Sequence, residues 1–240
     1  MANFVLVHGM GAGGWQWRDV ADQLRGAGHE VYAPTLTGLG ERAHLLTPET
    51  DLETHISDVS SVIECEELTD VVLVGHSYGG MVVTGAADRQ FSSIATLIYL
   101  DAFLPENGQS VMDLQPPDRI DYYNEIAKEK GDGWRIPTPP AEFWKLTDPE
   151  DIAQFDRLKV DHPLAALKQP VQLQNPRPKN RAFVWASGFT PSPFEKFAAA
   201  CREDDSWLYR EIDSGHQMMM SHPLEVADIV LELSHLGGVT

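Results

Sequence analysis

The stretch Val71-Val72-Leu73-Val74-Gly75-His76-Ser77-Tyr78-Gly79 decides the fold of this 240-residue chain. Its four apolar residues predict a buried strand, and the small residues that follow, 80–87, predict a helix. Ser77 therefore stands at the tip of a tight turn between a strand and a helix. A Cβ atom two positions before or after that serine would collide with the strand or the helix, which explains Gly75 and Gly79. A turn of this kind projects the hydroxyl of Ser77 freely, as a nucleophile requires.

Strands and helices alternate in the pattern on both sides of this turn. We predict strands over 4–7, 30–33, 71–74, 94–100, 182–186 and 207–212, and helices over 15–27, 52–66, 80–87, 194–202 and 225–235. This alternation indicates a largely parallel sheet covered on both faces, the α/β class. Ligands of such sheets bind beyond the carboxyl ends of the strands, so the residues that directly follow each strand are the informative ones.

The middle of the chain has a different character. Residues 105–178 are rich in proline, show weaker periodicity and include several aromatic side chains. We predict an inserted cap of short helices over 105–178 and a core domain formed by 1–104 and 179–240.

Composition limits the partners of the protein. The chain has 36 acidic and 18 basic residues, a net charge of −18, so nucleic acid and anionic membranes are not expected as partners. No apolar run approaches transmembrane length and Met1 leads straight into a strand, which predicts a cytoplasmic protein. Cys65 and Cys201 are interpreted as small core residues in a reducing compartment. The oligomeric state stays open, with a homodimer among the options.

Chemistry-bearing residues follow four of the predicted strands. His8-Gly9-Met10 follows the first strand, Ser77 the third, Asp101 the fourth and His216 the last. Acyl transfer needs a nucleophile, a base that takes its proton and a carboxylate that orients the base. It also needs two N–H groups that receive the developing oxyanion.

At these residues the chain resembles the α/β-hydrolase family. His8-Gly9 with Trp15, and Gly215-His216-Gln217 with the methionines and His222-Pro223 after it, are similar to a small-capped branch of that family. This branch holds plant methyl esterases, hydroxynitrile lyases and bacterial carboxylesterases. The resemblance implies the α/β-hydrolase fold, a mostly parallel central sheet flanked by helices with a small inserted helical cap. It also implies Ser77 as nucleophile, His216 as base, and the N–H groups of Met10 and Tyr78 as the oxyanion hole.

The acid is where this chain departs from that branch. There the acid follows the strand after the cap, but here residues 187–190 contain no carboxylate. In other α/β-hydrolases the acid follows the preceding strand, which is the place of Asp101. We therefore favour Asp101, with Asp213, Asp204 or Asp205 as alternatives and Ser187 as a weak orienting group.

Substrate contacts are expected from residues near the strand ends and from the cap. The candidates are Gly9, Phe103, Trp134, Phe143, Trp144, Trp185 and Met218, although cap aromatics and methionines also suit a core. His8 and His76 are interpreted as structural, and Asp161-His162 as a solvated turn rather than a metal pair. The glycines at 11, 13 and 14 lack the Lys-Ser/Thr of a phosphate loop. Neither a metal nor an organic cofactor is expected.

The predicted activity is hydrolysis of small to medium apolar or aromatic carboxylic esters through an acyl-enzyme on Ser77. Lactone and thioester hydrolysis would use the same groups. Hydroxynitrile lyase chemistry is disfavoured, because Gly9 and Gln217 stand where the related plant enzymes use threonine and lysine. A non-catalytic ligand receptor that retains the fold is the alternative from another class.

Overall fold

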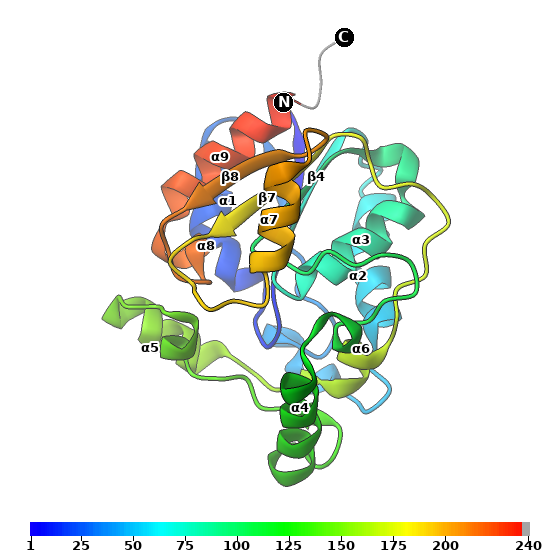
Figure 1. The fold of residues 1–240 in the computed structure, drawn as a ribbon. Helices are drawn as coiled ribbons and strands as arrows, with labels where there is room; N and C mark the ends of the chain where they lie inside the picture. Colours follow the sequence, from blue (N-terminus) through cyan, green and yellow to red (C-terminus); the bar gives the residue numbers. More distant parts are fainter. Residues whose placement is uncertain (237–240) are drawn as a thin grey trace.

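The structure is a computed structural model and describes residues 1–236. A parallel sheet of six strands forms its centre (Figure 1). Residues 237–240, the end of the predicted core range, lie outside the described residues. The strand order is β2-β1-β3-β4-β7-β8, and every neighbouring pair is parallel. The strands are β1 (Asn3–Val7), β2 (Glu30–Tyr32), β3 (Val71–His76), β4 (Ile94–Leu100), β7 (Arg181–Ala186) and β8 (Leu208–Ile212). The predicted fold class is confirmed.

Helices cover both faces of this sheet (Figure 1). On one face α1 (Arg18–Gly26) packs against α9 (Pro223–Leu236), and on the other α2 (Leu52–Cys65) packs against α3 (Gly79–Arg89). α7 (Glu195–Glu203) packs on β7 and β8. The helix predicted over 15–27 begins as a 3₁₀ turn, Gly14–Trp17, and becomes α-helical only at Arg18.

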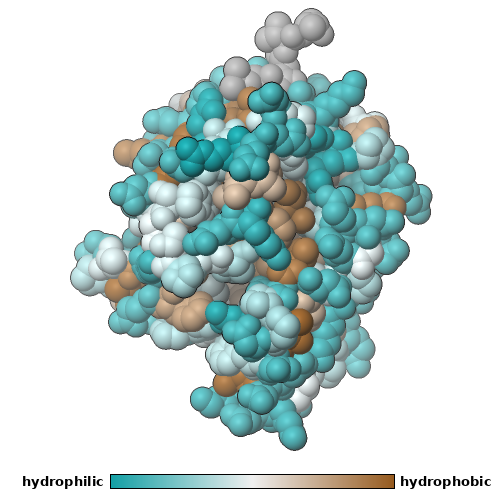
Figure 2. Space-filling model, viewed as in Figure 1, coloured by the Kyte–Doolittle hydropathy of each residue, from teal (hydrophilic) through white to brown (hydrophobic). Residues whose placement is uncertain are grey.

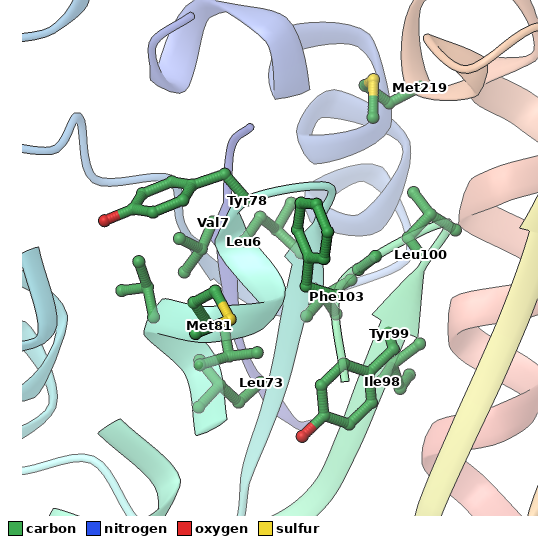
Figure 3. Packing of buried hydrophobic residues seen from close by; sticks show 14 of the residues in the cluster. Leu6, Val7, Leu73, Tyr78, Met81, Ile98, Tyr99, Leu100, Phe103 and Met219 are labelled. Carbon is green, nitrogen blue, oxygen red and sulfur yellow. The ribbon is translucent and has the colours of Figure 1, made fainter. Parts of the chain in front are cut away.

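The core lies between the sheet and these helices (Figure 3). All six residues of β3 are buried, as expected of a central strand covered on both faces. Leu6, Val74 and Ile98 are register neighbours on β1, β3 and β4, and none is exposed. Burial of such a side chain contributes about 1.5–3 kcal/mol. This packing makes the sheet a rigid base for the residues at its strand ends.

Short helices from the middle of the chain lie together at one end of the sheet (Figure 1). They are α4 (Pro117–Lys130), α5 (Pro149–Leu158) and α6 (Leu164–Lys168), and α6 packs against α2. A two-stranded antiparallel ladder of β5 (Arg135–Ile136) and β6 (His162–Pro163) accompanies them. Two-residue strands carry no periodicity, so the sequence did not indicate this ladder. The boundaries 105–178 stay a prediction.

The surface is mostly hydrophilic on the face seen in Figure 2, with apolar atoms gathered in a strip across its middle. No helix within residues 1–236 combines the length and the apolar character needed to cross a bilayer. Both cysteines are free thiols. Cys201 is buried as predicted, but the prediction for Cys65 is wrong, because it ends α2 on the exposed side.

Candidate active site

Ser77 occupies a strained turn between β3 and α3. Its φ is +55°, a left-handed conformation that side chains other than glycine rarely adopt. The turn is closed by the carbonyl of Ser77, which accepts from the amides of Gly80 and Phe103, both at 3.1 Å. A Cβ on Gly75 would lie 2.5 Å from Val83 Cγ2, and one on Gly79 would lie 2.8 Å from the carbonyl oxygen of His8. The two glycines are therefore required by close packing around the serine.

Asp101 and His216 are joined by a short hydrogen bond. Nδ1 of His216 lies 2.6 Å from Oδ2 of Asp101, and both side chains are buried. Asp101 directly follows β4 with a φ of +43°, and its amide donates to the carbonyl of Val184 at 2.7 Å. The end of one strand is thus fixed against its neighbour so that the carboxylate faces the imidazole.

The three alternative acids, Asp213, Asp204 and Asp205, lie exposed at the surface. Asp204 accepts the amide of Ser206 at 2.9 Å, and the hydroxyl of Ser187 donates to the carbonyl of Ile212 at 3.2 Å. Among the candidates from the sequence, Asp101 is the one that the structure brings to His216.

His216 is enclosed by aromatic rings. Phe194, Phe189, Trp144 and His76 place their ring centroids 4.4–5.1 Å from that of the imidazole. Burial lowers the pKa of His216, because the imidazolium form would lose its hydration there. Burial likewise raises the pKa of the Asp101 carboxyl. With Nδ1 facing Asp101, the lone pair of a neutral imidazole is on Nε2, which has no partner among residues 1–236.

The backbone around His216 is held from two sides. Its amide donates to the carbonyl of Trp144 at 2.9 Å, and its carbonyl lies 2.9 Å from Nε2 of His76. A carbonyl only accepts, so Nε2 of His76 carries the proton. The structural interpretation of His76 agrees with this contact.

The two predicted oxyanion-hole amides have no acceptor among residues 1–236. Neither Met10 nor Tyr78 donates its N–H to any of the described residues, and both residues line the same small pocket as Ser77. Nδ1 of His8 lies 2.8 Å from the carbonyl of Gly9, and Nε2 of His8 accepts the amide of Leu36 at 3.0 Å. Because a peptide unit is planar and trans, holding the Gly9 carbonyl also sets the direction of the Met10 N–H.

An inner pocket lies at the serine, and an outer pocket adjoins it. The inner pocket, about 30 Å³, is lined by Met10, Ser77, Tyr78, Phe103, Val111, Gln115, Tyr123, Trp144, Leu167, Pro193 and Phe194. The outer pocket, about 280 Å³, is lined by Gln115, Arg119, Tyr123, Phe143, Trp144, Lys145, Phe189, Thr190, Pro191 and Pro193. Four residues are common to both linings, so the two pockets adjoin each other. Gln115, Phe189 and Phe194 were not singled out from the sequence.

Three of the predicted substrate contacts line these pockets, and a fourth, Gly9, lies next to Ser77. Phe103 lines the inner pocket, Phe143 the outer one and Trp144 both. Gly9 lies beside the serine, since a Cβ on it would be 2.9 Å from that of Ser77.

Three other predicted contacts lie outside both pockets, which corrects their assignment. Trp185 faces α7 and lines a separate surface hollow with Ala198 and Arg202, because alternate residues of a strand point to opposite faces. Trp134 stacks with the guanidinium of Arg135 at 5.2 Å. Met218 is fully buried in the core.

Two buried histidines, His55 and His162, differ most from what the sequence analysis predicted. The prediction of a solvated turn at Asp161-His162 is wrong for His162, which is fully buried and packs against Tyr78 with 4.5 Å between ring centroids. The sequence analysis also missed His55, whose Nδ1 lies 2.8 Å from the hydroxyl of Tyr78. Its position three residues after Leu52, on the apolar face of α2, was the available signal. No cluster of three or more His, Cys, Asp or Glu suited to a metal ion occurs within residues 1–236.

Residues 4–229 match the model of the alpha/beta hydrolase family. The chain belongs to this family. This hydrolase is 44% identical over 247 residues to a carbendazim hydrolyzing esterase from Nocardioides sp. (strain SG-4G), covering 99% of this chain and all of that one. It is 35% identical over 159 residues to methylesterase 7 of Arabidopsis thaliana, covering 63% of this chain and 58% of the relative. The hydrolase also shares its fold with an extracellular alpha/beta-hydrolase from a Paenibacillus species, with a TM-score of 0.86, 22% identity and coverage of 98% and 100%.

The family match and the esterase relative confirm the prediction that this hydrolase is an enzyme of the carboxylesterase type. The resemblance to the methyl esterase and hydroxynitrile lyase branch is also confirmed. An alpha-hydroxynitrile lyase from Arabidopsis thaliana is 33% identical over 131 residues, 54% of this chain and 49% of that protein.

Proposed function

We propose that this enzyme hydrolyses carboxylic esters through an acyl-enzyme on Ser77, with His216 as base and Asp101 as its orienting acid. The observation that carries the proposal is the 2.6 Å hydrogen bond between buried Asp101 and His216. It leaves the Nε2 atom of a neutral imidazole with a free lone pair in the same site as the serine turn. The two unpaired amides of Met10 and Tyr78 complete the set of groups that acyl transfer needs.

The reaction proceeds in two halves. Oγ of Ser77 attacks the ester carbonyl while its proton passes to Nε2 of His216, and the carbonyl π electrons move onto the oxygen. The amides of Met10 and Tyr78 donate to that oxyanion, and the tetrahedral intermediate collapses when His216 protonates the departing alkoxide. His216 then takes a proton from water, the hydroxide attacks the acyl carbon, and the carboxylic acid leaves as Ser77 recovers its proton.

Ser77 and His216 share no hydrogen bond in this structure. Rotation of the serine hydroxyl about its Cα–Cβ bond is the step that we assign to substrate binding, because catalytic hydrogen bonds often tighten only in the Michaelis complex. Asp101 contributes by fixing the tautomer and by stabilising the imidazolium that forms transiently.

The two pockets indicate which part of the ester each of them could hold. The inner pocket beside Ser77 is narrow and suits a small group, whereas the outer pocket presents Phe143, Trp144 and Phe189 and suits an aromatic one. The full-length match to an esterase named for carbendazim hydrolysis supports carbendazim as a candidate substrate here. Gln217 accepts a hydrogen bond from Gln16 at 2.5 Å. Gln217 is a neutral residue at the position after His216, where the related lyases have a lysine, which favours hydrolysis.

The test is turnover of p-nitrophenyl acetate and butyrate, together with carbendazim. We expect multiple turnovers from the wild type, none above background from Ser77→Ala, and labelling of Ser77 by a fluorophosphonate, detected by peptide mass spectrometry. Equal rates for the two proteins would contradict the mechanism and would favour a receptor that retains the fold.

A further inference from the structure

A buried tyrosine and two buried histidines lie behind the oxyanion hole, and the steps proposed above use none of these side chains. Tyr78, His55 and His162 come from the serine turn, from α2 and from β6, and each is at most 1% exposed. Their rings are in mutual contact, with centroids 4.5–6.0 Å apart. In Figure 3 the Tyr78 ring points away from Phe103.

We propose that His55 and His162 are positioning residues of the oxyanion hole, His55 through the hydroxyl of Tyr78 and His162 through the amide of Gly11. The inference rests on the proposed function, because it assigns a role to the amides of Met10 and Tyr78. It adds two residues to the machinery, one of them from the predicted cap.

The tautomer of His55 follows from its two partners. Nε2 of His55 lies 2.9 Å from the carbonyl of Thr37, which can only accept, so Nε2 carries the proton. Nδ1 is then an acceptor, and the hydroxyl of Tyr78 donates to it at 2.8 Å. The phenol is thereby tied through α2 to the loop that contains Thr37. Because the same residue supplies the oxyanion-hole amide, this chain of hydrogen bonds restrains the position of its backbone.

His162 acts on the other half of the hole. The amide of Gly11 donates to Nδ1 of His162 at 3.3 Å, and the carbonyl of Gly11 accepts the amide of Val160 at 2.8 Å. The peptide before Met10 is held by His8 and the peptide after it by His162, so both neighbours of the Met10 Cα atom are fixed.

The contact at Gly11 is too close for any side chain. Gly11 has a φ of +66°, and a Cβ there would lie 1.8 Å from the Thr138 hydroxyl and 2.7 Å from the Val160 carbonyl oxygen. The absence of a side chain at Gly11 lets the segment 138–162 close on the backbone of the hole.

Both rings can act as hydrogen-bond acceptors because they are neutral. Burial lowers the pKa of His55 to about 4 and the pKa of His162 well below its usual value. A protonated Nδ1 on either ring would have no lone pair for Tyr78 or Gly11.

The experiment is a double-mutant cycle of Tyr78→Phe and His55→Leu, with His162→Leu measured beside it. Tyr78→Phe keeps the ring and the backbone amide and removes only the hydroxyl. We expect each variant to lower kcat roughly tenfold, a part of the ~10²–10³-fold cost of deleting an oxyanion donor. The KM of p-nitrophenyl acetate should stay within about twofold. Affinity for a trifluoromethyl ketone, which mimics the tetrahedral oxyanion, should fall by the same factor as kcat/KM.

The cycle separates positioning from a general loss of structure. The double variant should be no slower than the slower single one, because both changes break the same hydrogen bond. His55→Gln, whose amide can both accept and donate, should recover part of the loss. His29→Leu is the matched control, since His29 accepts the amide of Ala2 before β1 and should leave kcat unchanged. Thermal unfolding shows which variants are folded at the assay temperature.

Wild-type kcat and inhibitor affinity in Tyr78→Phe would overturn the role of His55, and the same values in His162→Leu would overturn that of His162. An increase in KM alone would also contradict positioning of the hole. Fluorophosphonate labelling of wild-type Ser77 is measured in parallel. Labelled wild type beside a fully active Tyr78→Phe would contradict this inference while leaving the proposed function intact.

Discussion

The imidazole of His216 lies almost parallel to the ring of Phe194, with 5.1 Å between centroids and 9° between planes. This stacking is the closest to parallel of the four ring contacts around the histidine. It excludes water from one face of the ring and so disfavours the charged form of the base. The pH dependence of the reaction should therefore report on Phe194.

The wild-type enzyme should keep its activity below the ordinary pKa of histidine, 6.5. The base acts when neutral, and burial lowers the pKa of His216, so kcat/KM should fall only when the pH drops through that lowered value. Phe194→Ala admits water to the imidazole of His216 and so raises the pKa of His216. The acid limb of the kcat/KM profile should therefore move to higher pH. The pH profile of kcat/KM measures this, with Phe197→Ala as control on the adjoining turn. An acid limb that does not move in Phe194→Ala would show that the stacking does not govern this pKa.

Asp101→Asn should abolish most of the activity while Asp213→Asn has little effect. The amide cannot stabilise an imidazolium and favours the wrong tautomer, which costs on the order of 10⁴-fold in kcat in the serine protease triad. Asp213 is exposed and Nδ1 of His216 is bonded to Asp101, so the Asp213 variant should stay within about twofold of wild type. Steady-state kinetics of both purified variants decide the matter, and the reverse pattern would reassign the acid.

Gly75→Ala should destabilise the protein, whereas Gly26→Ala should stabilise it. The new Cβ at 75 meets Val83 Cγ2 at 2.5 Å and the Gly79 carbonyl oxygen at 2.7 Å, and overpacking of this kind costs about 1–3 kcal/mol. Gly26 ends α1 with nothing within 4 Å of the new atom, where alanine gains about 0.5–1 kcal/mol. Urea unfolding measures both free energies. A neutral Gly75→Ala would mean that the serine turn can relax.

Leu167→Ala should broaden the range of accepted groups. Leu167 lines the inner pocket and is 1% exposed, so its truncation adds room beside Ser77. We expect kcat/KM for p-nitrophenyl hexanoate to rise about tenfold relative to acetate, within the ~1–3 kcal/mol that a hydrophobic pocket gains per methylene. Leu24→Ala, in the core at α1, is the control. Like Leu167→Ala it should lower the free energy of unfolding by about 2–5 kcal/mol, but it should leave the ratio of the kcat/KM values for hexanoate and acetate unchanged. Unchanged selectivity in Leu167→Ala would place the variable group of the ester outside the inner pocket.

Much of the fold and part of the site could be predicted from local pattern. The apolar run 71–74 and the glycines around Ser77 specify a strand and a turn within a few residues. Asp101 could be preferred because parallel strands end at one edge of the sheet, so a residue after β4 can meet one after β8. The strand and the turn need only periodicity and turn chemistry, whereas the choice of Asp101 among the acids also used the resemblance to other α/β-hydrolases.

The errors arise where side-chain direction or distant packing decides. Trp185 was expected at the substrate because it belongs to the strand after the cap, but the alternation of that strand turns it toward α7. His162 was expected in solvent because Pro163 follows it, and its burial depends on how residues 138–162 close over Gly11. The division into two pockets depends on the same long-range packing, which no local pattern encodes.

The hydrogen bond from the His216 amide to the Trp144 carbonyl has a consequence for protein engineering. Exchange of the inserted segment is one way to give a capped enzyme a new specificity. Here a transplanted segment would also have to supply a carbonyl oxygen at the place of residue 144, or the loop that carries the base would lose its anchor. Grafts whose ends fall on either side of 141–145 and leave that short stretch native are therefore the better starting points for chimeras.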